Sequence, residues 1–396
     1  MASHTWLMEK WQFNLPTKII FGQGAAEEAA VEAKKFGKKV FMVVDEIIRK
    51  IGLLEKVEKP LRDNGFEIKY FTPEPEPRIE TAKLVVETVR EQKYDLVMGI
   101  GGGSSMDLAK VASIMATNPG EVTDYIGINL VQKPGIPKIL MPTTAGTGAE
   151  VTPNAILASS VEENKTAIVS PYNFADVAII DPLMTLTMPP KVTAVTGLDA
   201  LTHAVEAYMS IRSNPLTDAI AYKAIQLIST YLPAAYADGE NIEARSCMSL
   251  AALMAGIAIC HAGTCAGHAA AYAFAVKYKI PHGLSCAIAL PYIMEYNAPV
   301  QLSKHVSIAE AMNERVSNLN AREAASKAVR SIVKLMNELD VPYRLKDIGV
   351  SKEDLPKLVE GMLKNTRLLK NNPRKVSKED AVKIFERMWE GKLNAL

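Results

Sequence analysis

YDLVMGIGGGSSMDLAKVA, residues 94–112, carries an apolar strand into a helix through a run of glycines. The strand part is apolar without alternation, a pattern typical of a parallel sheet that is covered on both faces. Glycines allow the backbone to approach an anion closely, and the free N–H groups at a helix start attract negative charge. The stretch therefore predicts a phosphate-binding turn in an α/β domain, with an ordinary tight turn as the alternative.

Five residues of this turn are predicted to contact a nucleotide: Gly101, Gly102, Gly103, Ser104 and Asp107. Ser104 is expected to open the helix, and Asp107 to complete a capping box three residues later. Because Ser104 stands where a third glycine would be required, the usual G-x-G-x-x-G dinucleotide signature is not met.

The alternation of strands and helices extends to both sides of the turn. Helices are expected from residue 25 and at residues 53–64 and 79–92, and strands at residues 18–22, 39–45, 67–71, 138–144, 155–159 and 177–182. Beyond residue 190, apolar residues recur three and four apart, as in helices, and no strand is expected. We therefore predict a Rossmann-like dinucleotide-binding α/β domain with a parallel sheet, residues 1–188, and an all-helical metal-binding domain, residues 189–396.

The composition points to a small-molecule partner. Lys and Arg total 45 against 44 for Asp and Glu, without long blocks of either sign, so neither nucleic acid nor an anionic membrane surface is expected as a partner. Four cysteines do not make a disulfide framework, and the N-terminal residues lack an apolar signal segment. We expect a cytoplasmic protein.

Residues 247–276 contain no Asp, Glu, Lys or Arg and are long enough to cross a bilayer. The run contains His261 and His268 together with several glycines, and ionisable groups in such a setting are costly and usually functional. We interpret the run as a buried part of the helical domain.

Two further features are expected near a bound nucleotide. The polar loop at residues 142–154 brings Thr143, Thr144 and Thr147 after a buried strand, where they could hold ribose or nicotinamide. Asp45 ends another strand, where its carboxylate could accept bonds from an adenosine ribose and repel a 2′-phosphate. A helix N-cap is the equally weighted alternative for Asp45.

A metal site is predicted from one carboxylate and three imidazoles. Asp199 and His203 are four apart in a helical segment, so they share one face. His268 and His282 follow within or just after the uncharged run. Singly, each histidine is more often a core residue, but the set of four suits Fe²⁺ or, alternatively, Zn²⁺. A competing structural zinc set would be Cys260, His261, Cys265 and His268.

On these motifs, the sequence resembles the iron-containing (group III) NAD-dependent alcohol dehydrogenases across nearly its whole length. The matching elements are residues 101–104 with Asp107 and Lys110, the loop at 142–150, the D-x-x-x-H pair at 199 and 203, the histidine at 268, and the P-H-G element at 281–283. The resemblance implies an N-terminal dinucleotide-binding domain, a helical C-terminal domain, a metal held by the four ligands, and cytoplasmic homo-oligomers.

The resemblance also implies the activity. We expect hydride transfer between NAD and a small primary alcohol or diol, with the metal polarising the substrate oxygen; the reverse reaction reduces an aldehyde. A glycerol-type dehydrogenase, a sugar-phosphate cyclase or a non-catalytic structural relative is the alternative.

The chain departs from the family at the position of a second histidine, which is Tyr272 here. Ile259, Cys260 and His261 also replace residues that are usual in the family. Tyr272 and His261 are therefore the candidates for proton transfer, and His261 is the better-matched titrating group. On an unbroken helix His261 and His268 would share one face, two turns apart.

Overall fold

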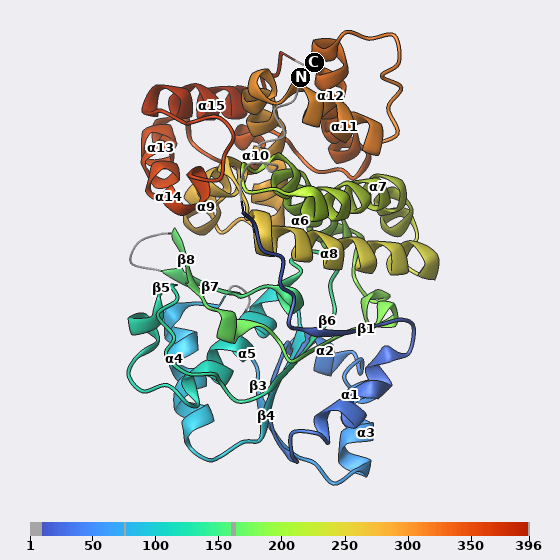
Figure 1. The fold of residues 1–396 in the computed structure, drawn as a ribbon, viewed down its shortest axis with the longest axis vertical. Coiled ribbons are helices and arrows are strands. Elements are labelled where there is room, and N and C mark those ends of the chain that lie inside the picture. The colour runs from blue at the N-terminus through green and yellow to red at the C-terminus, as the bar shows by residue number, and fades with distance from the viewer. Residues whose placement is uncertain (1–9, 75–76, 160–163, 395–396) are drawn as a thin grey trace. The chain divides into compact units, whose positions relative to one another are not determined.

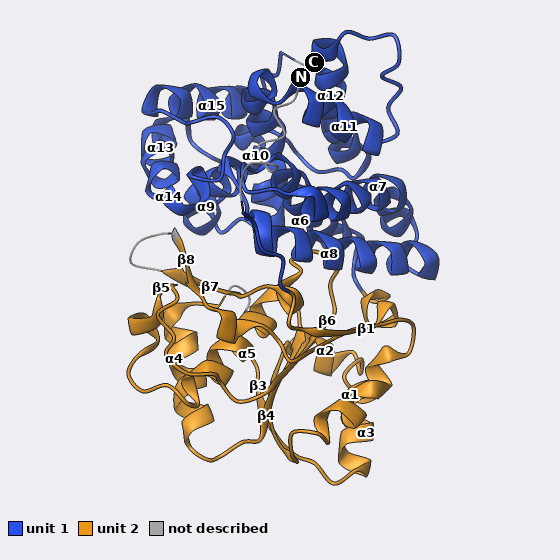
Figure 2. Cartoon of the chain, viewed as in Figure 1, with its two compact units in different colours: residues 1–14, 188–396 blue, residues 15–187 orange. Residues whose placement is uncertain are grey.

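The computed structural model describes residues 10–74, 77–159 and 164–394. The chain forms two compact units, residues 15–187 and residues 1–14 with 188–396 (Figure 2). The described residues 10–14 thus group with the helical unit, whereas the sequence analysis assigned them to the α/β domain.

The α/β unit contains a six-stranded sheet in which every pairing is parallel, in the order β1-β9-β6-β4-β2-β3 (Figure 1). The strands are β1 (Lys18–Phe21), β2 (Lys39–Val44), β3 (Glu67–Phe71), β4 (Leu96–Gly101), β6 (Lys138–Pro142) and β9 (Val177–Ile180). All six were predicted, because each is an apolar run bounded by helix or turn signals.

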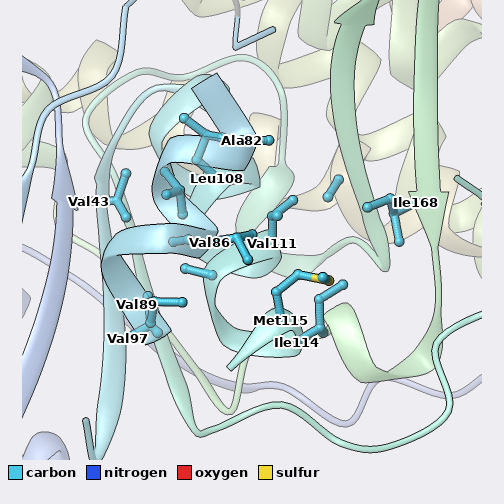
Figure 3. Packing of buried hydrophobic residues seen from close by; sticks show 14 of the residues in the cluster. Val43, Ala82, Val86, Val89, Val97, Leu108, Val111, Ile114, Met115 and Ile168 are labelled. Carbon is cyan, nitrogen blue, oxygen red and sulfur yellow. The ribbon is translucent and has the colours of Figure 1, made fainter. Parts of the chain in front are cut away.

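Helices cover both faces of this sheet. They are α1 (Glu28–Ala33), α2 (Glu46–Lys50), α3 (Glu55–Asp63), α4 (Ile79–Arg90) and α5 (Gly103–Met115). Side chains of β2 alternate between two cores: Phe41 and Val43 join residues of α4 and α5, whereas Met42 joins residues of α1 and α3. Figure 3 shows the core that includes Val43, in which Val86 of α4 and Val111 of α5 lie close to each other. The predicted two-sided burial is confirmed.

A second, three-stranded sheet was not predicted. It consists of β5 (Gly127–Ile128), β8 (Asn164–Val169) and β7 (Asn154–Ser159), with β7 and β8 antiparallel. The strand expected at residues 155–159 belongs to this sheet and not to the main one.

The second unit is helical, and the structure shows no strand among the described residues after β9. Its helices are α6 (Pro190–Met209), α7 (Pro215–Ala237), α8 (Ile242–Ala262), α9 (Ala266–Tyr278), α10 (His282–Asn297), α11 (Leu302–Ala311), α12 (Ala321–Glu338), α13 (Leu355–Lys364), α14 (Thr366–Leu369) and α15 (Lys378–Glu390). The predicted fold class, a parallel α/β part followed by a helical part, is confirmed.

The long uncharged run folds as two helices, α8 and α9, separated at Gly263. Gly263 has a φ of 70°, a conformation that glycine adopts without a steric penalty and that ends α8. Among the described residues, α8 is long and apolar enough to cross a membrane, but it packs against α6 and α7 inside the unit. This packing accounts for its apolar composition.

Candidate functional site

A cluster of metal-ligating side chains forms where α6, α9 and α10 meet. Asp199 lies on α6, His268 in the first turn of α9, and His282 and Cys286 in the first turns of α10. Each of these four residues offers one ligand atom, and the four atoms all lie within 4.8 Å of one another.

His203 adjoins this group through His268. The two imidazole rings stack with their centroids 4.8 Å apart and an angle of 26° between their planes. The ring centroids of His268 and His282 are 5.4 Å apart, and His282 Nε2 lies 3.9 Å from Asp199 Oδ1. Three of the four predicted metal ligands, Asp199, His268 and His282, therefore share one cluster with Cys286, which was not predicted. The fourth, His203, lies outside this cluster of ligand atoms and contacts it by stacking on the His268 ring.

The close packing of α10 against α6 places His282 beside Asp199. A Cβ atom on Gly283 would lie 2.4 Å from the carbonyl oxygen of Val195 and 3.0 Å from the Cβ of Asp199. Glycine is therefore required at this position for the two helices to approach.

Two buried atoms of the cluster have no hydrogen-bond partner within the described chain, namely Asp199 Oδ1 and His268 Nε2. Asp199 is 2% exposed and His268 is 1% exposed. Leaving such atoms unpaired costs free energy, and both are acceptors that a cation satisfies. The residues present thus fit a bound divalent metal.

Glu206 fixes the orientation of His268 from the side opposite to this free nitrogen. Its carboxylate lies 2.6 Å from His268 Nδ1 and accepts the backbone N–H groups of Gly267, at 2.6 Å, and Cys265, at 3.1 Å. It thereby caps the start of α9 and sets Nδ1 as the donor, which leaves Nε2 as an acceptor. Glu206 was not predicted as a site residue, although a carboxylate three residues after His203 in an apolar helix was a usable signal.

In the α/β unit, the two loops predicted to hold a nucleotide lie side by side. The backbone N–H of Thr143 donates to the carbonyl oxygen of Gly101 at 2.9 Å. A Cβ atom on Gly103 would lie 2.9 Å from Thr147 Cγ2, and one on Gly102 would lie 3.8 Å from Thr144 Oγ1. Gly101 has a φ of 147°, so it also needs to be glycine.

Asp45 contacts the glycine turn. Its carboxylate accepts hydrogen bonds from the backbone N–H of Gly102, at 3.1 Å, and from Ser105 Oγ, at 2.6 Å. Asp45 occupies the N-cap position of α2, but its side chain makes no capping bond there. The alternative, a helix N-cap, is therefore confirmed for the position of Asp45 but not for a capping bond of its side chain.

The predicted capping box of Ser104 and Asp107 is wrong. The N-cap of α5 is Gly102, so Ser104 already lies inside the helix. Asp107 instead accepts hydrogen bonds from Lys110 Nζ and from the backbone N–H of Ile156, both at 3.0 Å, which joins α5 to β7. Burial raises the pKa of Asp107. These bonds show a structural link between α5 and β7.

A second buried acid lies at the end of the threonine loop. Glu150 is 2% exposed, and burial raises the pKa of its carboxyl group to about 7. Lys110, which is fully buried, partly opposes this shift through its positive charge.

The predicted alignment of His261 with His268 is not realised, because the helix is interrupted between Ala262 and Ala266. His261 stacks on Phe13, with centroids 4.1 Å apart. Burial, and secondarily the charge of Arg212, lower the pKa of His261.

Tyr272, in contrast, lies against the ligand cluster. Its ring centroid is 5.5 Å from that of His282 and 6.1 Å from that of His268.

The competing structural zinc set does not assemble in the described chain. The cluster takes only His268 from that set, and Cys265 Sγ lies 3.5 Å from the carbonyl oxygens of Glu206 and Asn371.

Each half of the chain matches the model of a known protein family. Residues 16–182 match the family described as iron-containing alcohol dehydrogenase, and residues 193–389 match the C-terminal part of the Fe-containing alcohol dehydrogenase family. The chain belongs to the iron-containing alcohol dehydrogenases. The predicted family is confirmed, and with it the predicted class of enzyme, a metal-dependent oxidoreductase of the alcohol dehydrogenase type.

Individual relatives cover almost the whole of this iron-containing alcohol dehydrogenase. It is 39% identical to long-chain-alcohol dehydrogenase 1 of Geobacillus thermodenitrificans over 93% of this chain and 94% of that protein. It is 36% identical to 1,3-propanediol dehydrogenase of Klebsiella pneumoniae over 96% of this chain and 99% of that protein.

Solved structures show the same fold. The crystal structure of a 1,3-propanediol oxidoreductase matches with a TM-score of 0.93 and 36% identity, over 96% of this chain and 100% of the other. An alcohol dehydrogenase from Oenococcus oeni matches with a TM-score of 0.92 and 35% identity, over the same shares.

Proposed function

We propose that the protein is an NAD-dependent alcohol dehydrogenase in which Asp199, His203, His268 and His282 hold one divalent metal, Fe²⁺ or alternatively Zn²⁺. The observation that carries this proposal is the pair of buried, unpaired acceptors, Asp199 Oδ1 and His268 Nε2, inside one cluster of ligand atoms. Membership of the iron-containing family supports Fe²⁺.

The described residues indicate how the site would work. When bound, the metal polarises the alcohol oxygen and the nicotinamide accepts hydride from the adjacent carbon. Glu206 holds the His268 ring in the tautomer that offers Nε2. The burial of Asp199 and His268 excludes water, which strengthens electrostatic interactions at the site.

We further propose that the turn at residues 101–104 receives the cofactor pyrophosphate, with Thr143, Thr144 and Thr147 beside it. Two observations support this assignment. The two loops contact each other, and α5 starts at Gly103, so its free N–H groups lie at this turn. The position of Asp45 at the same turn supports NAD over NADP, because its charge opposes a 2′-phosphate.

Asp45→Gly should reduce the preference for NAD over NADP, measured as the ratio of kcat/KM values, by about tenfold or more, because a like-charge contact costs at least about 1.4 kcal/mol. Asp45→Asn is the matched control, since it removes the charge but keeps an acceptor for Gly102 or Ser105. A ratio that stays constant in both variants would leave Asp45 with a purely structural role.

For the substrate, we propose a small primary alcohol or diol, with aldehyde reduction as the reverse reaction. A relative named for 1,3-propanediol supports this class, whereas long-chain-alcohol dehydrogenase 1 is named for larger alcohols. The test is a panel of primary alcohols, diols and aldehydes with both nicotinamide cofactors, on metal-free protein and on protein reconstituted with Fe²⁺ or Zn²⁺. Equal turnover with and without metal would refute the proposal.

For the proton that leaves the alcohol, we propose a route past Tyr272 and not past His261. Tyr272→Phe should lower kcat about tenfold, less than the full effect of a general base because water can replace the hydroxyl. His261→Asn is the control and should leave the pH profile of kcat unchanged, since His261 stacks on Phe13. The opposite pattern, with metal content intact in both variants, would restore His261 as the relay.

We also propose a cytoplasmic homo-oligomer. The family resemblance supports both the cytoplasmic location and the oligomer. Light scattering of the purified protein tests the oligomeric state.

A further inference from the structure

Cys286 adds a sulfur atom to the ligand cluster. It lies four residues after His282 on α10, so both side chains project from the same face of the helix. Cys286 Sγ is 3.6 Å from His282 Nε2 and 3.7 Å from Nδ1, and the residue is fully buried. The sulfur is within 4.8 Å of the ligand atoms of Asp199 and His268 as well.

The separation of Cys286 Sγ and His282 Nε2 is that of two ligands in one coordination shell. A zinc ion bonds sulfur at about 2.3 Å and imidazole nitrogen at about 2.0–2.1 Å, which in a tetrahedron places the two atoms about 3.6 Å apart. Cys286 Sγ and His282 Nε2 already have this separation.

A buried cysteine is often only a small apolar residue that fills space. Two observations argue for more at Cys286. The neighbouring Asp199 Oδ1 and His268 Nε2 are buried without a hydrogen-bond partner in the described chain, and the thiol lies within the group that these two acceptors form. A buried group of one carboxylate, two imidazoles and one thiol is a donor set typical of a transition metal.

We infer that Cys286 Sγ is a further ligand of the metal, in addition to the four ligands of the proposed site, Asp199, His203, His268 and His282. This inference rests on the proposed function, since it concerns the same site, but it adds a ligand that the family resemblance does not include. The sulfur–metal bond forms as the S–H bond breaks, the proton passes to solvent, and no electron is transferred.

A thiolate makes the site softer, which favours Zn²⁺ and Co²⁺ over Mn²⁺. Cys286→Ser should therefore weaken Zn²⁺ binding about tenfold or more, because it removes a direct ligand, and should change Mn²⁺ binding much less. Competition with a chelator measures both affinities on the metal-free, full-length protein.

The decisive probe is Co²⁺, added in equimolar amount to the metal-free protein. We expect a strong thiolate-to-cobalt charge-transfer band in the near ultraviolet for the wild type, absent in Cys286→Ser. Cys247→Ser is the matched control, because Cys247 lies near the start of α8, outside the cluster, and its removal should leave the band intact.

The outcomes are separable. Cobalt that binds to the wild type without the band overturns the role of Cys286 and leaves the proposed metal site standing. Failure of the wild type to bind Co²⁺, Zn²⁺ or Fe²⁺ overturns both. The spectrum of the cobalt-loaded wild type can by itself overturn the role of Cys286, so the test does not depend on the folding of Cys286→Ser.

Discussion

Replacing His268 by alanine should abolish metal retention and lower kcat/KM by about 10³-fold or more, because several kcal/mol of charge stabilisation in the transition state depend on the metal. His268 supplies the buried Nε2 acceptor, and Glu206 holds its other nitrogen. Elemental analysis of the purified variant and steady-state kinetics measure the two effects.

His305 offers a matched control for the loss of a buried imidazole. It is fully buried in the same unit, but its ring nitrogens lie 3.0 Å and 2.9 Å from the carbonyl oxygens of Gln301 and Met294. His305→Ala should lower stability and keep the metal. A His268→Ala variant with a full complement of metal, or a metal-free wild type with full activity, would exclude the proposed site.

Glu206→Gln should weaken metal binding about 10–100-fold, the usual effect of losing a partner behind a ligating histidine. The carboxylate accepts N–H groups from Cys265, Gly267 and the His268 ring, whereas an amide offers one acceptor and one group of donors. At least one donor is then left facing an NH₂ group, which should cost about 1–3 kcal/mol of stability.

The measurements for Glu206→Gln are the Kd for Zn²⁺ and the Tm of the metal-free protein. Glu314→Gln is the control, because Glu314 binds Lys327 and Ser331 in the same unit, with no contact to the metal ligands. If Glu206→Gln lowers Tm but leaves the Kd unchanged, Glu206 is only the cap of α9.

The main sheet and the helical unit were predictable because their signals are local. Each parallel strand is an apolar run, and in each long helix the apolar residues are spaced three and four residues apart. The small sheet was missed because β5 has two residues and β8 begins with polar and charged ones, so its pairing with β7 is a tertiary effect. The same holds for residues 10–14, whose partners lie far along the sequence.

At the site, the four proposed ligands were predictable from spacing and apolar surroundings, whereas Glu206 and Cys286 were not. The roles of these two residues depend on how α6, α9 and α10 pack. Two errors have local causes. The helix start at Gly103 moved Asp107 out of its predicted capping role, and the backbone of Gly263 interrupts the helix that would have aligned His261 with His268.

The grouping of residues 10–14 with the helical unit also has a consequence for synthesis on the ribosome. Phe13 leaves the ribosome before the entire α/β unit, but the ring on which it stacks, His261, is made about 250 residues later, roughly 10 to 50 s at ordinary translation rates. The α/β unit can complete its own sheet during this interval, since residues 15–187 contain all of its strands. Phe13 therefore has no stacking partner until α8 is finished, and its ring stays solvated or bound by a chaperone until then.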